Sequence, residues 1–521
     1  MRKWWMFVLL VAYALLLASC ARQATPPDTA VVIIESSPTN LDPRVGTDAQ
    51  SERIGKLLFD ALVTRDEHFN IQPGLAERWE IPDPLTYVFH LRHNVRFHDG
   101  RPLTSADVKW TLDSILSGKV RTAKASTYRF IDRIETPDAS TVIIRLKEPY
   151  SSLLWNLSDG AFGVIPANSG DDFNRRLIGS GPFRFVSAVQ DREVVIERNE
   201  HYWAGPVKIP RVRFMVVPDA TTRALELRKG SADVAINALT PDTVLTLRHE
   251  PALVTQRAPG TIYSYLALNL RDPILRDVRV RQALAYALNR EPLIHYLWRD
   301  MARPAAGVLP TQHWAFNPDV PKYPHDPARA RELLDQAGYK AGADGVRFRL
   351  TMKTSTEEST RLLAAVFQQQ LRDVGIALDI RSFEFATFYS DVTRGAFQLY
   401  SLRWIGGNED PDIFEHIFES TATPPRRANR GYYSNPEVDR LLQLARRTVD
   451  QQERRRYYAA IQQHVAHDLP YVNLWYMDNV IVHNRRLANV HLTSSGNYDF
   501  LKTAELHSNG GKLSTSTEKS P

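Results

Sequence analysis

Residues 346–380 carry the pattern that most restricts how this chain can fold. Residues 346–350 and 376–380 alternate apolar and polar side chains, as β-strands do. Between them, residues 360–374 place apolar side chains at helical spacing and end at Gly375. Strand, helix and strand in so short a stretch form a βαβ unit, whose two strands run parallel because the helix carries the chain back. The sequence therefore predicts an α/β protein that contains a parallel sheet with right-handed crossovers.

A further predicted strand runs from Phe397 to Trp404 and leads into the glycine-rich stretch IGGNEDPD. Open α/β sheets bind ligands just beyond the carboxyl ends of their strands. We therefore expect a binding site at Trp404 and in the loop that follows it. The loop residues expected to contact the ligand are Ile405, Gly406, Gly407, Asn408 and Asp410.

Size and charge exclude several classes of protein. A chain of 521 residues is too long for one simple core and predicts two or three lobes. The formal net charge of +6 is mild, and Arg2 and Lys3 of the predicted leader supply part of it, so binding to nucleic acid has no electrostatic support. The C-terminal segment 508–521 has too few apolar side chains for packing, with Leu513 its one large example, and we expect it to be disordered.

The N-terminal segment is typical of an exported protein. A basic start is followed by an apolar run from Trp4 to Leu17, which is too short to span a membrane and fits a signal peptide. Residues 17–20, Leu-Ala-Ser-Cys, resemble the lipobox of bacterial lipoproteins, whose cysteine is lipidated and becomes the first residue after cleavage. We expect residues 1–19 to be the signal peptide, Cys20 to be lipidated and residues 20–30 to form a tether to the outer side of a membrane. Because Cys20 is the single cysteine, no internal disulfide is expected.

The stretch NVRFHDGRPLTSADV, residues 94–108, raises the question whether His98 and Asp99 form a catalytic pair. Asp99-Gly100 is a strong tight-turn dipeptide, the strand before it alternates from Thr86 to Leu91, and a helix capped by Thr104 or Ser105 follows it. A polar hairpin is therefore the favoured interpretation. The histidines of this segment match no metal-ligand spacing; they are His90, His93 and His98.

The motifs that carry common chemistries are missing from the sequence. It contains no GxxxxGK[ST] phosphate loop, no GxSxG elbow, no HExxH helix and no EF-hand loop. The sequence therefore predicts no catalysis, no cofactor and no metal. A catalytic triad scattered along the chain stays open as an alternative, because the spatial arrangement of its residues defines a triad and their order in the sequence does not.

Several long blocks, in their order, resemble one known family. The strongest block is residues 73–108, PGLAERWEIPDPLTYVFHLRHNVRFHDGRPLTSADV; others are GSGPFRF, VVPDATTRALELRKGSADVA, LRDVRVRQALAYALNRE and GYYSNPEVDRLLQLARR. From Val31 to about His507 the chain resembles family 5 of the bacterial extracytoplasmic solute-binding proteins. That group contains the dipeptide-, oligopeptide- and nickel-binding components of ABC importers.

The resemblance implies an α/β fold of the periplasmic-binding-protein type, class II, with two main lobes, a hinge of two crossings and an inserted extra lobe. The crossings would lie near 265–269 and 477–480, and the solute would bind between the first and third lobes and be enclosed by their closure. The implied divisions are residues 31–55, 174–262 and 480–507 for lobe I, 56–173 for the inserted lobe II, and 263–479 for lobe III.

The resemblance also implies binding residues. The turn Ser37-Pro38-Thr39-Asn40 corresponds to the lobe I segment that lines the cleft, and Trp404 corresponds to the tryptophan of the lobe III wall, whose flat face suits a ligand. Further aromatic side chains are expected nearby, with core packing as the alternative for each: Tyr263, Tyr265, Phe385 and Phe388.

One position departs from the peptide-binding members. Those members have an aspartate three residues after the tryptophan, and it pairs with the α-ammonium of the peptide, whereas this chain has Gly407. A buried ammonium without a partner costs several kcal/mol. Glu409 and Asp410 are either substitutes for that aspartate or ordinary turn and cap residues. Within the family, nickel complexes and oligosaccharides therefore compete with peptides as the solute.

Together these features predict a monomeric, membrane-tethered lipoprotein that captures a small, peptide-like solute and delivers it to an ABC permease with its ATPase. No bond of the solute would be broken. Two alternatives remain open at this stage: an enzyme, either a hydrolase or a metal-dependent protein, built on the same scaffold, and a lipoprotein that acts as a sensor or chaperone without transport.

Overall fold

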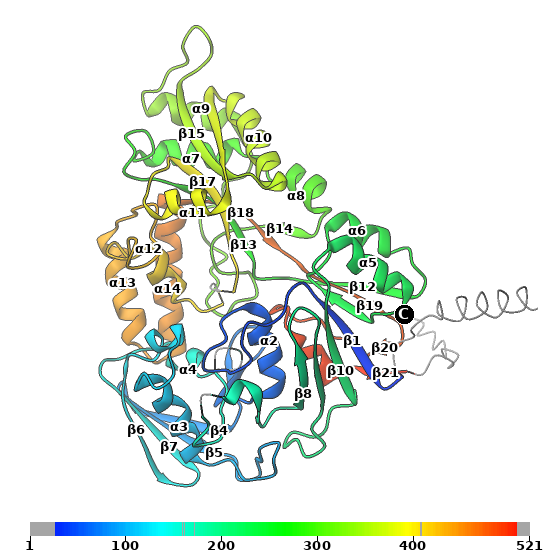
Figure 1. Ribbon diagram of the computed structural model, residues 1–521. Helices are drawn as coiled ribbons and strands as arrows, with labels where there is room; N and C mark the ends of the chain where they lie inside the picture. Colours follow the sequence, from blue (N-terminus) through cyan, green and yellow to red (C-terminus); the bar gives the residue numbers. More distant parts are fainter. Residues whose placement is uncertain (1–26, 159, 161, 171, 407–408, 508–521) are drawn as a thin grey trace, which may run out of the picture.

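The computed structural model describes residues 27–158, 160, 162–170, 172–406 and 409–507. Three large sheets of seven, four and six strands organise this part of the chain, and we call the regions around them lobes I, II and III (Figure 1). The predicted signal peptide, Cys20 and the C-terminal tail lie outside the described residues. Within the described part, no helix combines the length and apolarity needed to cross a membrane.

Lobe I is a mixed sheet with β1 at its centre. All six residues of β1 (Thr29–Ile34) are buried, because parallel strands pair with both of its edges and core clusters cover both of its faces. The other strands of this sheet are β8 (Phe183–Val189), β9 (Glu193–Arg198), β10 (Arg211–Val216), β11 (Val234–Ile236), β12 (Leu253–Ala258) and β19 (Asn479–Asn484). The accompanying elements are α2 (Ala49–Leu58), α5 (Ala220–Lys229), α6 (Pro241–Leu247), β20 (Leu487–Ala488), η3 (Tyr498–Lys502) and β21 (Glu505–Leu506).

A buried ion pair joins distant parts of lobe I. Arg486 Nη2 donates to Asp233 Oδ2 at 2.8 Å, and the side chains of these residues are 7% and 1% exposed. The same carboxylate accepts the backbone N–H of Val31 at 2.7 Å. Asp233 therefore connects the central strand β1 to the segment that follows β19.

Lobe II is an antiparallel sheet covered by one helix. Its strands follow the order β4-β5-β7-β6, and α3 packs on β6 and β7. Thr104 and Asp107 form a capping box at the start of α3, which confirms the predicted cap. The elements are β2 (Val63–Arg65), β3 (Ile71–Pro73), β4 (Ala76–Asp83), β5 (Thr86–Leu91), α3 (Ser105–Leu116), η1 (Ala123–Ser126), β6 (Ile131–Asp138), β7 (Thr141–Leu146), α4 (Leu153–Asn156) and η2 (Phe173–Arg175).

His98 holds the predicted hairpin against the chain segment that returns to lobe I. Its Nδ1 accepts the N–H of Gly179 at 3.1 Å, so its Nε2 carries the proton and donates to the carbonyl of Gly181, also at 3.1 Å. Burial lowers the pKa of His98 from 6.5 to about 4. Asp99 pairs instead with Arg101 at 2.9 Å. His98 thus acts as a neutral structural residue.

Lobe III contains the predicted βαβ unit. It consists of β15 (Phe348–Ser355), α10 (Glu358–Arg372) and β16 (Ile376–Phe383), and β15 and β16 pair in parallel along their whole length. The expected parallel sheet is only part of the structure, however, because β13 (Tyr263–Leu268) pairs antiparallel with β17 (Leu399–Trp404) and β18 (Tyr471–Met477). β13 and β18 are the strands by which the chain enters and leaves the lobe, so as neighbours they run in opposite directions.

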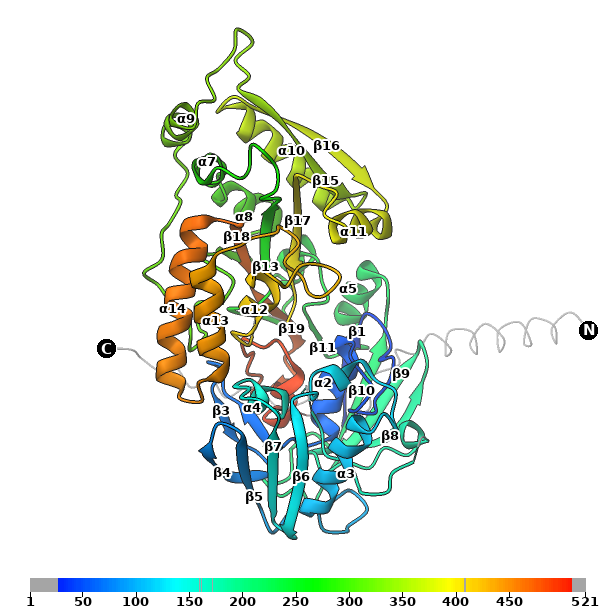
Figure 2. The same ribbon diagram turned by 90° about the vertical axis from the view of Figure 1, so that its left-hand side faces the viewer.

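The short strand β14 (Ala302–Pro304) forms one edge of this sheet beside β18, and the helices of lobe III surround it (Figures 1 and 2). Asn435 caps α13 by accepting the N–H groups of Glu437 and Val438, and Pro436 is its first residue. These helices are α7 (Val278–Ala287), α8 (Glu291–Trp298), α9 (Pro327–Gln336), α11 (Phe385–Thr393), α12 (Ile413–Phe418), α13 (Pro436–Arg447) and α14 (Gln451–Asp468).

Two short connections join lobes I and III. The first comprises residues 259–262, earlier than the predicted 265–269, because Tyr265 lies within β13. The second is Asp478, within the predicted range. A Cβ on Gly260 would lie 2.3 Å from the carbonyl oxygen of Met477, so the two connections are tightly packed. Asp478 pairs with Arg257 at 2.6 Å and with Arg303 at 2.9 Å, one from each lobe.

Candidate ligand-binding site

Trp404 is the last residue of β17, a strand inside the lobe III sheet, and the sequence predicted a site at this carboxyl end. Its half-buried ring lies parallel to Tyr265 at 6.3 Å between centroids and meets the ring of His416 edge-on at 6.0 Å. The guanidinium carbon of Arg430 lies 5.5 Å from the centroid of the indole. Contacts on several sides therefore hold the indole in one orientation.

A hollow of about 640 Å³ opens close to Trp404, whose indole is not among the side chains that line it. His416 and Arg430 line it and also contact the indole. Its volume lies in the range of pockets for small molecules. The lining residues come from α11, α12 and the segment after α12; they are Tyr389, Thr393, Arg394, His416, Pro424, Pro425, Arg426, Arg427, Ala428, Arg430 and Tyr432.

Several arginine side chains line the hollow, and His416, which also lines it, is neutral. Burial, with help from Arg427 and Arg430, lowers the pKa of His416 and keeps the imidazole neutral. The guanidinium of Arg427 pairs with Glu415 at 2.5 Å, and that of Arg394 pairs with Asp391 at 2.6 Å. Arg430 instead donates to the Tyr389 hydroxyl at 2.8 Å.

The structure separates the four aromatic residues predicted near the site. Tyr263, Tyr265 and Phe388 are 0%, 1% and 1% exposed and belong to the core of lobe III, so they offer a solute no surface. Both tyrosines project from one face of β13 and pack in a cluster with side chains of α12 and α14, such as Phe418 and Tyr458, which explains why they are enclosed. Phe385 is 54% exposed and stacks on Tyr389 of the hollow at 5.9 Å. Of these four residues, Phe385 alone presents an accessible face.

The loop after Trp404 turns toward lobe II and the first lobe connection. Ile405 is 65% exposed, whereas the predicted contacts Gly407 and Asn408 lie outside the described residues. Glu409 pairs with Arg65 of lobe II at 3.4 Å and accepts the Thr261 hydroxyl at 3.2 Å. Contact of Ile405 and Gly406 with a solute stays a prediction.

Asp410 was predicted to contact the ligand, and the structure assigns it a different role. Its carboxylate accepts the Ser152 hydroxyl of lobe II at 3.1 Å and the N–H of Asp412 at 2.8 Å. Burial, together with the nearby Asp412, raises its pKa to about 7. Asp410 is thus a turn residue that contacts lobe II, and neither it nor Glu409 replaces the aspartate of the peptide binders.

Sequence reasoning missed His313, which positions this loop. The imidazole is 3% exposed, its Nδ1 accepts the N–H of Ala315 at 3.0 Å, and its Nε2 donates to the carbonyl of Glu409 at 3.1 Å. The ring also stacks on Phe69 of lobe II at 5.5 Å. Burial lowers the pKa of His313 to about 3, so the neutral tautomer persists.

The predicted lobe I wall is a turn that follows the carboxyl end of β1. Ser37 Oγ accepts the N–H of Asp191 at 2.7 Å, the N–H of Thr39 donates to Asp48 at 3.1 Å, and the N–H of Asn40 donates to Ser51 at 3.2 Å. Pro38 is buried, whereas Thr39 is exposed. The contact of this turn with a solute stays a prediction.

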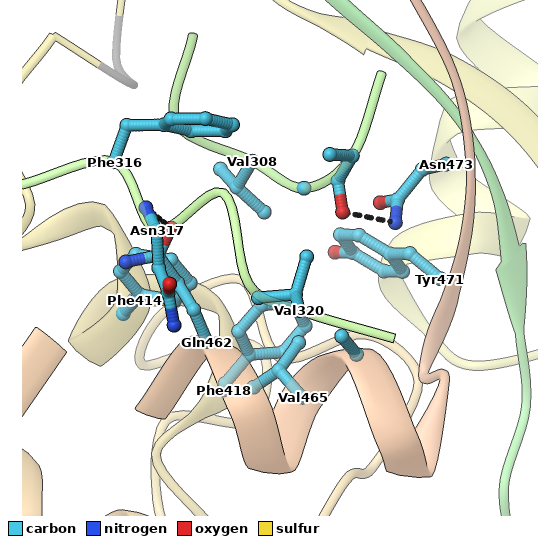
Figure 3. A pocket seen from close by; sticks show the side chains of 13 residues that line it. Val308, Phe316, Asn317, Val320, Phe414, Phe418, Gln462, Val465, Tyr471 and Asn473 are labelled. Carbon is cyan, nitrogen blue, oxygen red and sulfur yellow. Dashed lines mark hydrogen bonds between the residues drawn. The ribbon is translucent and has the colours of Figure 1, made fainter. Parts of the chain in front are cut away.

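A second hollow lies deep in lobe III and is not a solute site (Figure 3). Its volume is about 20 Å³, enough for roughly one water molecule. Apolar side chains such as Val308, Val320 and Phe418 surround it (Figure 3). At one end, Asn473 Nδ2 donates to the carbonyl of Ala306 at 3.0 Å.

Comparison with known proteins identifies the chain. Residues 70–424 match the model of the bacterial extracellular solute-binding proteins, family 5 middle region. The chain belongs to this family. The glutathione-binding protein GsiB of Pectobacterium atrosepticum is 30% identical over 486 residues, which cover 91% of this chain and 92% of GsiB.

Two solved structures share the architecture. NikZ from Campylobacter jejuni, in complex with Ni(L-His), is 26% identical and has a TM-score of 0.75, with coverage of 92% of this chain and 100% of NikZ. The ABC transporter-associated periplasmic binding protein DppA from Helicobacter pylori, in complex with the peptide STSA, is 25% identical with a TM-score of 0.72, covering 92% and 98%. The predicted family and fold class are therefore confirmed, and the chain is an extracytoplasmic solute-binding protein of the ABC transporter type.

Proposed function

We propose that this family 5 protein captures a peptide-like solute in a cleft between lobes I and III and delivers it unaltered to an ABC permease. The observation that supports this most is the hollow beside Trp404, at the carboxyl end of a central strand and close to the exposed Phe385. GsiB and DppA align with almost the whole chain; the first is named as a glutathione-binding protein, and the second was solved in complex with a peptide.

The two lobe connections support a mechanism by closure. The chain passes between lobes I and III twice, through residues 259–262 and through the single residue Asp478. A rotation of the backbone at these two connections moves one sheet against the other.

A solute that contacts both the turn 37–40 and the Trp404 wall binds the closed form more tightly than the open form. Binding therefore shifts the equilibrium toward the closed form. Micromolar binding requires about 8 kcal/mol. Closure of the lobes over an open hollow lined by Tyr389, His416 and Tyr432 supplies the burial that such binding needs.

We further propose that Cys20 carries a lipid and tethers a monomeric body to the outer face of a membrane. The supporting feature is the sequence Leu-Ala-Ser-Cys after the apolar run. Protein recovered from membranes should have an N-terminal peptide that starts at a lipidated Cys20 in mass spectrometry. A Cys20→Ser variant that stays in the membrane fraction to the same extent would contradict the tether.

A thermal-shift screen of the purified protein tests the proposed function. The panel contains tripeptides including reduced glutathione, oligosaccharides and nickel–histidine complexes. At a hundred times its dissociation constant, a bound peptide should add about 2.7 kcal/mol to the free energy of unfolding. Mass spectrometry of the recovered ligand should show the starting compound. A response confined to sugars or metal complexes, or conversion of the peptide into a product, would refute the proposal.

A further inference from the structure

We infer that the solute carries a carboxylate, or an acidic group of similar shape, that pairs with Arg430 in the hollow beside Trp404. This inference rests on the proposed function, because it names the chemistry of the solute at the same site.

The burial of Arg430 is the first observation. The residue is 8% exposed and yet lines the hollow, so its guanidinium is removed from bulk water while one side faces the empty volume. Taking a charge out of water costs several kcal/mol unless an opposite charge compensates it. Among the described residues, no carboxylate lies within ion-pair distance of Arg430, and neither Gly407 nor Asn408 carries one.

The contacts that Arg430 does make orient it without neutralising it. Nη2 donates to the neutral Tyr389 hydroxyl, and the guanidinium lies 5.2 Å from the Tyr389 ring and 5.5 Å from the Trp404 ring. Aromatic faces attract a cation but leave its N–H donors available. A guanidinium fixed in this way matches a carboxylate, which accepts two parallel hydrogen bonds from it.

Two other arginines of the hollow, Arg394 and Arg427, provide the contrast. Arg427 is held by Glu415 and Glu419, and Arg394 by Asp391, so protein carboxylates already compensate these two charges. Arg430 is therefore the cation of the hollow that combines deep burial with neutral partners.

Isothermal titration calorimetry with matched ligand pairs tests the inference on the unmodified protein. Each pair consists of a tripeptide with free carboxylates and the same tripeptide with those groups converted to amides; reduced glutathione and its diamide form the first pair. We expect at least a tenfold loss of affinity on amidation in the pairs that bind. Equal affinities within such pairs would overturn the inference and leave the proposed function intact, whereas failure of all pairs to bind would overturn both.

A variant assigns the effect to Arg430. Arg430→Gln should lose at least tenfold more affinity for the acid than for the amide, so that the preference disappears. Arg394→Gln is the matched control, because Arg394 lines the same hollow but pairs with Asp391, and its preference should persist. An acid preference that survives in folded Arg430→Gln would refute the assignment. If that variant does not fold, the ligand pairs on the unmodified protein still decide the inference.

Discussion

The neutral state of His98 leads to a prediction about stability and pH. In the folded protein, Nδ1 accepts a backbone N–H from Gly179, and protonation of that nitrogen would place two donors against each other. Burial lowers the pKa of His98 from 6.5 to about 4. Because the folded state binds the proton less readily than the unfolded state, His98 stabilises the fold above pH 6.5, and this stabilisation declines as the pH falls toward 4.

The magnitude follows from these two pKa values. At pH 5 the unfolded imidazole is almost fully protonated and the folded one is almost neutral, which makes the unfolded state more favourable by about 2 kcal/mol relative to pH 8. His98→Gln removes the titration and retains one acceptor and one donor. We expect the unfolding free energy of the variant to fall about 2 kcal/mol less between pH 8 and pH 5 than that of the unmodified protein.

Urea denaturation at the two pH values measures this difference. His93→Gln serves as the control, because His93 is an exposed residue of the same hairpin. The comparison between proteins cancels the contributions of other titrating groups, such as the carboxyl of Asp410. Equal losses of stability in His98→Gln and the unmodified protein would show that the histidine is not held in its neutral form by the segment 179–181.

Three further substitutions test the account of the fold and the site. Trp404→Ala removes the ring that contacts Tyr265, His416 and Arg430; it should abolish the ligand-induced thermal shift, and an unchanged shift would exclude the indole from the site. Asp233→Asn leaves Arg486 buried without its carboxylate; urea denaturation should show a loss of about 3–5 kcal/mol, and a loss below about 1 kcal/mol would contradict the pairing. Gly179→Ala places a Cβ 1.8 Å from the carbonyl oxygen of Leu58; it should lower the melting temperature by several degrees, and an unaltered melting temperature would show that the close approach is absent.

The features predicted well from sequence are those that depend on neighbouring residues. The βαβ unit from β15 to β16, the capped helix α3 and the hairpin around Asp99 follow from local periodicity and turn chemistry. The position of Trp404 at a strand end follows from the same reasoning. These elements are decided by side chains within one segment, so a single sequence contains the required information.

The features that were missed depend on contacts between distant segments. Glu409 and Asp410 face lobe II because Arg65 and Ser152, from an insertion much earlier in the chain, supply their partners. Arg430 reaches Trp404 through the packing of the segment after α12. The run RRANR, residues 426–430, signalled a concentration of positive charge, but nothing local indicated which of its arginines would be buried.

The burial of Tyr263 and Tyr265 has a similar origin. β13 was expected to lie at a lobe crossing with its tyrosines facing the solute. Instead it pairs with β17 and β18, and side chains of α12 and α14 cover its tyrosines; all of these elements come from much later in the chain. The first lobe connection consequently lies before Tyr263. Strand partners at such separation leave no local trace in the sequence.

Closure of lobes I and III over an unaltered solute is the central claim, and a distance measurement between the lobes tests it most directly. Spin labels are placed at Leu225→Cys on α5 and Leu362→Cys on α10, both at exposed positions, in a Cys20→Ser background that has no other cysteine. Double electron–electron resonance should give a shorter distance with saturating tripeptide ligand than without it. The control pair Leu225→Cys and Val186→Cys, within lobe I, should give the same distance in both states. A distance between the lobes that does not change when the ligand is demonstrably bound would contradict the account.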